Sequence, residues 1–397
     1  MKKALIITNT ASMVHLFNGV NIDILQDAGY EVHIACNFHD GNTASESAIE
    51  DYKKVWEEKG IVSHHIGFLR SPFSLKSFSL YRETKKLIRK GKFDIIHCHT
   101  PIVSVFTRLA AQKLRREYGA KVIYTAHGFH FYKGCPAKNW ILYFGIEKAL
   151  AHMTDLLITI NREDYDRAIK YFRAKKIIYT NGVGIDIDQI NSCECHRTDI
   201  RSQLGILDDD IMLTSVGELN NNKNHIKAIE AISRCKNKNI HYVVCGIGYA
   251  KEKLLEASRE FGVENRLHLL GFRKDVLAVL KSSDIFIFPS IREGLSVALM
   301  EAMAAGLPII ASKIRGNIDL IVKDKGGFLC ERFDALCFAN AIDMLSSDGN
   351  LRKNMGEYNK NKIKAYDKKI VYEQLSKALF DSCEWPVYDK EGVSVEV

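Results

Sequence analysis

The sequence has few of the residues that break a chain or cross-link it. Only six prolines and ten scattered cysteines occur among its 397 residues. Its apolar fraction of 46% and charged fraction of 26% are those of a globular chain and exclude a largely disordered one. Because 397 residues exceed what one ordinary core supports, we expect two domains.

Long apolar runs are missing as well. No stretch approaches the ~20 residues that a membrane-spanning helix needs, and the apolar start at residues 4–7 is too short for a signal peptide. The cysteines form no framework, so we expect reduced thiols in a cytoplasmic protein. Cys193 and Cys195 are the one close pair, and the sequence offers no second cluster to complete a metal site with them.

The positive charge is concentrated in one half of the chain. Residues 1–186 contain 27 Lys and Arg against 18 Asp and Glu, whereas the remainder is nearly balanced. Such an asymmetry indicates an anionic partner of the first half, either a membrane surface or nucleic acid.

Short runs rich in Val and Ile alternate with longer segments of helical period. This alternation predicts an α/β fold with two Rossmann-like doubly wound domains, each a parallel sheet covered by helices. Gly182 and Gly184 mark a turn between the halves, which gives domains at residues 1–186 and 187–365. Residues 366–397 are expected to form a helix and tail that return to the first domain. The expected strands are 4–8, 31–36, 94–98, 121–125, 156–160, 176–180, 212–216, 241–245, 266–270, 285–289 and 308–311.

The most informative stretch is residues 288–308, a predicted strand followed by a loop and a helix. In a parallel sheet, ligands bind at the carboxyl ends of the strands, and a helix start offers free N–H groups to phosphate. Glu293 precedes this helix and Glu301 lies two turns into it, so both can accept hydrogen bonds from sugar hydroxyls. The alternative is that both are ordinary solvated helix carboxylates. The candidate phosphate-binding amides are those of Gly294, Leu295 and Ser296.

A second strand-loop-helix stretch covers residues 215–225. Its loop contains Gly217, Lys223 and Asn224, and Lys223 can bring a positive charge to a phosphate. The alternative for Lys223 is an ordinary solvent-facing lysine before a helix.

Histidines end two strands of the first half. His97, His99, His127 and His130 would suggest a metal-dependent hydrolase if they bound a metal, but no carboxylate is placed to complete the site. They can equally be buried, hydrogen-bonded histidines. The Asp-rich segments at 186–188 and 208–210 lie in linker or turn positions, so no metal is expected there either.

The stretch from Pro289 to Pro308 resembles the Glu-x7-Glu motif of retaining glycosyltransferase family 4, which includes bacterial capsule and exopolysaccharide transferases. Both its Pro-Ser-x-x-Glu-Gly start and its Glu-Ala-Met-Ala-x-Gly-x-Pro end match. The resemblance covers nearly the whole chain. It implies the GT-B fold, with two Rossmann-like domains facing a central cleft.

The resemblance also implies roles for individual residues. Glu293 would contact the donor sugar, Glu301 the ribose and Lys223 the phosphates. His127 would lie near the transferred sugar and His99 on the acceptor side. The implied catalytic set is His127, Glu293 and Lys223, and the implied donor-binding set is Gly217, Lys223, Asn224, Phe272, Arg273, Glu293, Gly294, Leu295, Ser296 and Glu301.

The implied reaction is retaining transfer of a hexose or N-acetylhexosamine-type sugar. The donor would be a UDP-sugar, the acceptor a lipid-linked or saccharide molecule, and neither a cofactor nor a metal is expected. A non-hydrolysing nucleotide-sugar epimerase and a non-catalytic subunit of a polysaccharide assembly complex are the two alternatives.

The sequence departs from the family pattern at two places. Glu218 stands where the family commonly has an arginine, which removes one expected cation from the diphosphate. Asn9-Thr10-Ala11-Ser12 stands where the family has a Gly-Gly loop after the first strand.

The segment from Leu69 to Lys92 is strongly basic and contains Glu83 as its single acid. Helical spacing places Leu80 and Leu87 on one side, which predicts docking on the anionic inner face of the cell membrane. The alternative is a surface helix whose apolar side packs on the sheet. Nucleic acid is not expected, since the aromatic residues are too few to form a stacking platform. The basic residues are Arg70, Lys76, Arg82, Lys85, Lys86, Arg89, Lys90 and Lys92.

Overall fold

The computed structural model of the chain describes residues 1–42, 44–69, 76–195, 197–380, 387–388 and 394–395. They form two compact units. The first contains Met1–Thr159, Asp164–Val183 and the chain from Lys369 onward, and the second contains Ile160–Glu163 and Gly184–Lys368. The chain therefore passes from the first unit to the second at Val183–Gly184 and returns at Lys368–Lys369.

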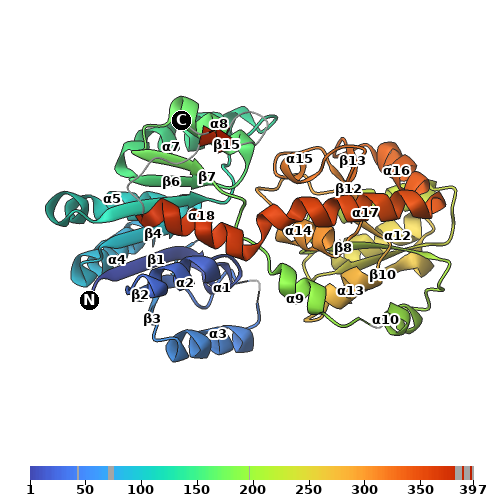
Figure 1. Ribbon diagram of the computed structural model, residues 1–397, viewed down its shortest axis with the longest axis horizontal. Coiled ribbons are helices and arrows are strands. Elements are labelled where there is room, and N and C mark those ends of the chain that lie inside the picture. Colours follow the sequence, from blue (N-terminus) through green and yellow to red (C-terminus); the bar gives the residue numbers. More distant parts are fainter. Residues whose placement is uncertain (43, 70–75, 196, 381–386, 389–393, 396–397) are drawn as a thin grey trace. The chain divides into compact units, whose positions relative to one another are not determined.

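The first unit is built on a seven-stranded sheet in which every neighbouring pair is parallel (Figure 1). Its order is β3-β2-β1-β4-β5-β6-β7. The strands are β1 (Lys3–Thr10), β2 (Glu31–Asn37), β3 (Val62–His65), β4 (Ile95–His99), β5 (Lys121–Ala126), β6 (Leu156–Thr159) and β7 (Lys176–Tyr179).

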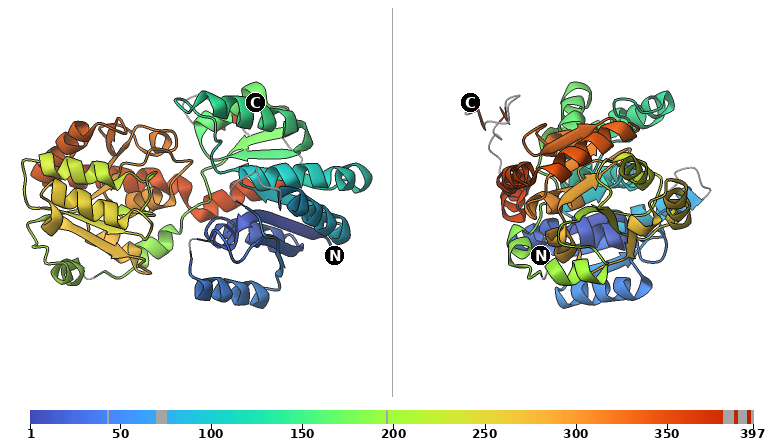
Figure 2. Two further views of the ribbon diagram at one scale, coloured as in Figure 1. Left: turned by 180° about the vertical axis from the view of Figure 1, so that it is seen from behind. Right: turned by 90° about the vertical axis from the view of Figure 1, so that its right-hand side faces the viewer.

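Helices cover both faces of this sheet, as the front and back views show (Figures 1 and 2). One core contains residues of α4 (Lys76–Gly91) and α5 (Pro101–Tyr118). The opposite core contains residues of α1, α2, α3 and α18 (Lys368–Phe380). Further elements of this unit are α1 (Ala11–Phe17), α2 (Gly19–Asp27), α3 (Glu46–Glu58), α6 (Ala137–Asn139), the π-helix η1 (Trp140–Phe144), α7 (Gly145–Leu150), the 3-10 turn η2 (Ala151–Met153) and α8 (Arg162–Tyr171).

The second unit has a six-stranded sheet, also parallel throughout, in the order β10-β9-β8-β11-β12-β13. The strands are β8 (Ile211–Val216), β9 (Ile240–Cys245), β10 (Leu267–Gly271), β11 (Ile285–Phe288), β12 (Ile309–Ser312) and β13 (Gly327–Cys330). The fold class predicted from the sequence, two Rossmann-like α/β domains, is confirmed.

Helices also cover both faces of the second sheet, α11, α12 and α16 on one and α13 and α14 on the other. The elements are α9 (Ile187–Ser192), α10 (Arg197–Gln203), α11 (His225–Arg234), α12 (Lys251–Glu260), η3 (Glu264–Arg266), α13 (Val276–Ser282), α14 (Val297–Ala304), α15 (Asn317–Leu320), α16 (Ala335–Ser347), α17 (Gly349–Ile363) and η4 (Lys364–Tyr366). Two short strands, β14 (Val387–Tyr388) and β15 (Ser394–Val395), pair near the carboxyl end.

The central strands are apolar without interruption because both of their faces are covered. Leu5, Ile6 and Ile7 are all fully buried, and successive residues enter opposite cores. All eleven expected strands are present. The sequence analysis missed β3 and β13, which are four-residue strands at the edges of the two large sheets, and the two-residue strands β14 and β15.

The apolar side of α4 packs in the core of the first unit, which is the alternative that the sequence analysis left open for this helix. Leu80 is 6% exposed and Ile88 is fully buried, and both belong to the first unit's core, with Leu87 packed against it. They are therefore not available to a membrane. Phe78, 69% exposed, is the large apolar side chain that α4 leaves outside. Arg70, Phe73 and Leu75 lie outside the described residues.

Each sheet contains one place where the order of strands along the chain reverses. It lies between β1 and β4 in the first unit and between β8 and β11 in the second. At such a switch point the neighbouring loops run in opposite directions, which leaves a crevice at the carboxyl ends of the strands. Among the described residues, no helix is long and apolar enough to cross a membrane.

Candidate active site

An ion pair lies at the switch point of the second unit. Lys223 is in the loop after β8, and Glu293 is in the loop after β11. The Lys223 Nζ lies 2.8 Å from Glu293 Oε1, and the two side chains are 19% and 14% exposed. The same ammonium is 4.6 Å from the centroid of the Phe288 ring. The two residues predicted to bind donor phosphate and donor sugar are therefore in direct contact.

The loop after β8 is shaped to hold Lys223 in this position. A Cβ atom at Gly217 would lie 2.9 Å from Lys223 Cε, so the glycine leaves room for the lysine stem. Asn224 adopts a left-handed backbone (φ 54°) immediately before α11. Its side-chain amide donates to Pro289 O at 3.1 Å and to Arg332 O at 3.0 Å. Asn224 therefore ties the loop after β8 to those after β11 and β13.

The next residue, His225, turns into the core. Its Nδ1 is 2.8 Å from the Tyr242 hydroxyl, and that hydroxyl donates to Ser215 Oγ at 2.9 Å. Burial lowers the pKa of His225 to about 3, so the ring is neutral. We assign it a structural role.

The loop after β11 leads into α14. The Ser296 hydroxyl caps this helix by accepting from Leu299 N at 3.3 Å, and Gly294 and Leu295 precede the cap. The first N–H groups of a helix have no partner within it, so this start can bind an anion.

Arg315, which the sequence analysis did not single out, anchors this loop. It is 6% exposed, and its Nε donates to Glu293 O at 3.1 Å. The following Gly316 has φ 78°, and a Cβ there would lie 2.2 Å from Gly294 O. The sequence signal that could have found Arg315 is the Arg-Gly pair just after a buried strand. The glycine lets the backbone approach another loop closely, and the arginine beside it can then contact that loop.

Glu301 lies in the second turn of α14. Burial raises its pKa to about 7. Its carboxylate has no hydrogen-bond or ion-pair partner in the described part of the chain. Glu301 is partly buried, so its carboxylate is available to accept hydrogen bonds from a ligand.

Phe272 and Arg273, two members of the implied donor-binding set, follow β10. Gly271 has φ 71°, which favours glycine, and the Phe272 side chain is 66% exposed. The Arg273 Nε donates to Asp275 Oδ1 at 2.7 Å, so this guanidinium already has a carboxylate partner. Glu218, at the position of the family's arginine, is exposed.

Three histidines cluster at the carboxyl ends of β4 and β5. His97 Nε2 is 2.8 Å from Thr125 Oγ1, and His99 Nδ1 is 3.0 Å from His127 Nε2. Burial lowers the pKa of His97 to about 3 and of His127 to about 4, and holds that of His99 well below its usual range. All three are therefore neutral near pH 7. The described residues contain no group of three or more His, Cys, Asp or Glu able to hold a metal ion.

These features define a class of protein, the GT-B glycosyltransferases. Each unit is a Rossmann-like parallel sheet, and the second carries Lys223 and the Glu-x7-Glu pair beside a helix start. The GT-B protein Alr3699/HepE of Anabaena, solved in complex with UDP, superimposes with a TM-score of 0.76 at 20% identity. The match covers 95% of this chain and 99% of that one.

The chain belongs to the glycosyltransferases. Residues 196–362 match the family Glycosyl transferases group 1, and residues 23–189 match Glycosyltransferase Family 4. The putative glycosyltransferase EpsD of Bacillus subtilis strain 168 is 35% identical over 357 residues, 88% of each chain. An Escherichia coli relative named UDP-Gal:alpha-D-GlcNAc-diphosphoundecaprenol alpha-1,3-galactosyltransferase is 32% identical over 293 residues, 70% of this chain and 74% of that one.

The raised pKa of Glu301 predicts a pH-dependent stability. Because the folded-state pKa of about 7 lies above the usual 4.5, stability is lost as pH rises from about 4.5 through about 7. Glu301→Gln removes this loss. We expect the substitution to raise the free energy of unfolding by up to about 3 kcal/mol at about pH 8 and by much less at about pH 5.

Calorimetric melting at the two pH values measures this difference. Glu256→Gln, at an exposed position on α12, is the matched control and should have little effect at either pH. An equal effect of Glu301→Gln at both pH values would mean that Glu301 is not held in a desolvated site.

Proposed function

We propose that this protein is a retaining glycosyltransferase of bacterial surface polysaccharide synthesis. It moves a hexose or N-acetylhexosamine-type sugar from a UDP-sugar to a lipid-linked or saccharide acceptor. The observation that carries the proposal is the Lys223–Glu293 ion pair beside the start of α14. The names of the relatives support it, since the Escherichia coli relative is named for transfer from UDP-Gal to a lipid-linked GlcNAc diphosphate.

Donor binding exchanges the partners of this ion pair. The diphosphate takes Lys223 and the first amides of α14, which supply positive charge without a metal ion. Glu293 is then released from Lys223 and accepts hydrogen bonds from hydroxyls of the donor sugar. While the site is empty, each charge neutralises the other, which lowers the cost of keeping both partly buried.

The nucleoside is bound further along the same sheet edge. Glu301 accepts hydrogen bonds from the two ribose hydroxyls, which gives partners to a carboxylate that has none among the described residues. The segment at Phe272 and Arg273 lies beside the nucleobase, in keeping with the exposed Phe272 ring.

The transfer step follows from the leaving group. Departure of UDP breaks the anomeric C–O bond and leaves oxocarbenium-like charge on the sugar. A phosphate oxygen of UDP takes the proton of the acceptor hydroxyl, which attacks the same face, so the configuration is retained. Lys223 and the α14 amides stabilise the charge that builds up on UDP. His127, neutral and hydrogen-bonded to His99, contacts the sugar near the reacting carbon, and His99 lies on the acceptor side.

The reaction is tested by incubating the purified protein with UDP-sugars and a lipid-linked N-acetylhexosamine diphosphate. We expect the acceptor to gain one sugar, at the same rate with and without EDTA. Loss of transfer with EDTA would contradict metal independence. An epimer formed from the UDP-sugar without acceptor would identify an epimerase instead. If the protein binds UDP but transfers no sugar, the result would support the alternative that the chain is a non-catalytic subunit of a polysaccharide assembly complex.

The two carboxylates of the motif should respond differently to substitution, because one contacts ribose and the other the sugar. Glu301→Gln should weaken UDP by about tenfold, from the loss of charge-assisted hydrogen bonds. Glu293→Gln frees Lys223, so UDP should bind as tightly as before or more tightly, while kcat/KM falls by about 100-fold.

Titration calorimetry with UDP and initial rates with the best donor separate these effects. Equal loss of UDP affinity in the two variants would contradict the assignment of their roles.

We further propose that the first unit binds the anionic inner face of the cell membrane through α4. Lys86, Arg89 and Lys90 are exposed on this helix, and Arg82 lies 5.9 Å from the ring of the exposed Phe78. Because the other apolar residues of α4 pack in the core, the attraction is mainly electrostatic. Each basic residue near an anionic surface contributes about 1 kcal/mol.

Sedimentation with vesicles tests this surface. Binding should require anionic lipid, weaken as salt rises, and fall by roughly 100-fold when Lys86, Arg89 and Lys90 are all changed to Glu. The control changes Lys251, Lys253 and Lys353, exposed lysines of the second unit, to Glu and so alters net charge equally. An equal loss in the control would show dependence on net charge alone and contradict the assignment to α4.

A further inference from the structure

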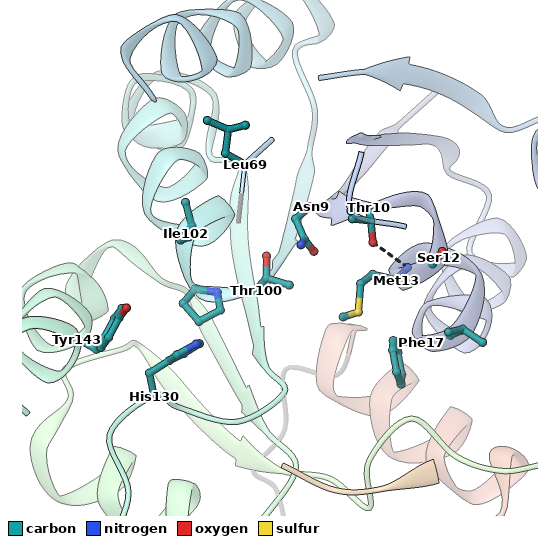
Figure 3. A pocket seen from close by; sticks show the side chains of 13 residues that line it. Asn9, Thr10, Ser12, Met13, Phe17, Leu69, Thr100, Ile102, His130 and Tyr143 are labelled. Carbon is teal, nitrogen blue, oxygen red and sulfur yellow. Dashed lines mark hydrogen bonds between the residues drawn. The ribbon is translucent and has the colours of Figure 1, made fainter. Parts of the chain in front are cut away.

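The first unit contains a cavity of about 470 Å³ at the switch point where β1 and β4 end. Asn9 and Thr100 lie at the ends of these two strands, and His130 and Tyr143 line one side of the cavity (Figure 3). His99, which the proposed function places on the acceptor side, also ends β4. The cavity therefore belongs to the acceptor side of the proposed reaction.

Two thiols of the second unit are in contact with each other. Cys330 ends β13, and Cys337 lies in the first turn of α16. The Cys337 thiol donates to Cys330 Sγ, and the two sulfur atoms are 2.6 Å apart. Because the sulfur atoms of a disulfide are about 2.0 Å apart, a small side-chain rotation brings these two to bonding distance.

The backbone is already fixed on both sides of this contact. Cys330 pairs with Ser312 in the sheet, and its carbonyl accepts from Lys313 N at 2.7 Å. The Asp334 side chain caps α16 by accepting from Cys337 N at 3.0 Å. The fold therefore holds the two thiols together, and neither the sheet nor the helix has to rearrange for a bond to form between them.

The two thiols differ in their access to an oxidant. Cys330 is fully buried, and its burial, together with the hydrogen bond from Cys337, raises the pKa of its thiol. Cys337 is partly exposed. An oxidant from solution therefore reaches Cys337 first, and Cys330 is the neighbouring thiol that can complete the reaction.

The loop between the two cysteines contacts the loops that contain Lys223 and Glu293. The Arg332 carbonyl accepts from the Asn224 side chain at 3.0 Å, and the Arg332 guanidinium donates to Ile291 O at 3.4 Å. Asn224 follows Lys223, and Ile291 lies two residues before Glu293. A bond between the cysteines closes their loop into a ring that contains Arg332. Such a ring restricts the loop to the arrangement in which it makes these contacts.

We propose that the Cys330–Cys337 pair is an oxidation site, at which a low-molecular-weight disulfide converts the two thiols reversibly into a disulfide bond. The bond fixes the loop of Arg332 in the arrangement that contacts the candidate donor site. Formation of the bond does not depend on the function proposed above, whereas its effect on UDP binding rests on that function.

The reaction is thiol–disulfide exchange in two steps. The Cys337 thiolate attacks one sulfur of the small disulfide, the bond between the two small-molecule sulfurs breaks, and one small thiolate leaves. The Cys330 sulfur then attacks the Cys337 sulfur and displaces the second small thiolate. The protons of both protein thiols go to the two leaving thiolates. The protein thus loses two electrons and two protons, and the small disulfide gains them.

Incubation with hydroxyethyl disulfide, followed by tryptic peptide mapping with mass spectrometry, tests whether the bond forms. Trypsin cleaves after Arg332, between the two cysteines, so the bond should join two peptides whose summed mass is lower by two hydrogens. Dithiothreitol should separate them. Cys330→Ala should instead retain one mercaptoethanol group on Cys337, because the second thiol is missing. Cys135→Ser, at a partly exposed cysteine of the first unit, is the control and should form the same bond as the wild type.

The melting temperature and the UDP affinity test whether the bond fixes the loop. We expect the oxidised wild type to melt a few degrees above the reduced protein, because the ring restricts the unfolded chain. It should bind UDP roughly threefold more tightly, because the loop is already ordered. Cys337→Ser should show neither change after the same treatment, and Cys135→Ser should show both.

Three results would overturn the proposal. The first is that both thiols of the wild type persist, or that mapping joins either of them to a different cysteine. The second is that the oxidised wild type binds UDP no more tightly than the reduced protein. The third is that Cys337→Ser gains UDP affinity after oxidation, since another thiol would then be responsible. If UDP binds in neither state while the mapped bond forms and raises the melting temperature, the result would contradict the proposed function and support the oxidation site.

Discussion

Parallel pairing of the strands is the constraint from which both candidate sites follow. A parallel strand is joined to the next by a crossover, so all the carboxyl ends of a sheet lie at one edge. Where the order reverses, the two crossovers leave for opposite faces and do not fill the edge between them. Lys223 and Glu293 stand at one such place, and Asn9 and Thr100 stand at the other. The topology therefore determines where the two sites lie, and the side chains at these positions determine their chemistry.

Burial shifts the pKa values of side chains at the two switch points in opposite directions. It raises the pKa of Glu301 to about 7 and lowers that of His127 to about 4, because in both cases the charged form loses hydration. The second unit keeps a charge at its edge by pairing Lys223 with Glu293. In the part of the chain that the structure describes, no counter-charge faces His97, His99 or His127, and these three stay neutral. This difference supports a division in which the second unit binds the phosphates and the first binds uncharged groups.

The sequence predicted what depends on continuous local patterns and missed what depends on tertiary contacts. Buried strands such as β1 can be predicted from their apolar runs, and the Glu-x7-Glu spacing marked Glu293 and Glu301 as candidate binding residues. The edge strand β3 was missed because Val-Ser-His-His is polar and short. The contact between Arg315 and the Glu293 carbonyl joins loops after different strands, so no local spacing predicts it. Thr100 before Pro101 reads as an ordinary helix cap, and only the backbone reveals its positive φ.

The departure from the family at residues 9–12 also has a physical consequence. Glycines there would leave the backbone amides at the start of α1 open to an anion. In this chain the Thr10 hydroxyl accepts from Met13 N at 3.4 Å, and Asn42 Oδ1 accepts from Ser12 N at 2.9 Å. Two of these amides are therefore already bonded within the protein and are not free to bind phosphate. The same four residues that remove the glycine loop thus make this sheet edge better suited to a neutral ligand than to an anionic one.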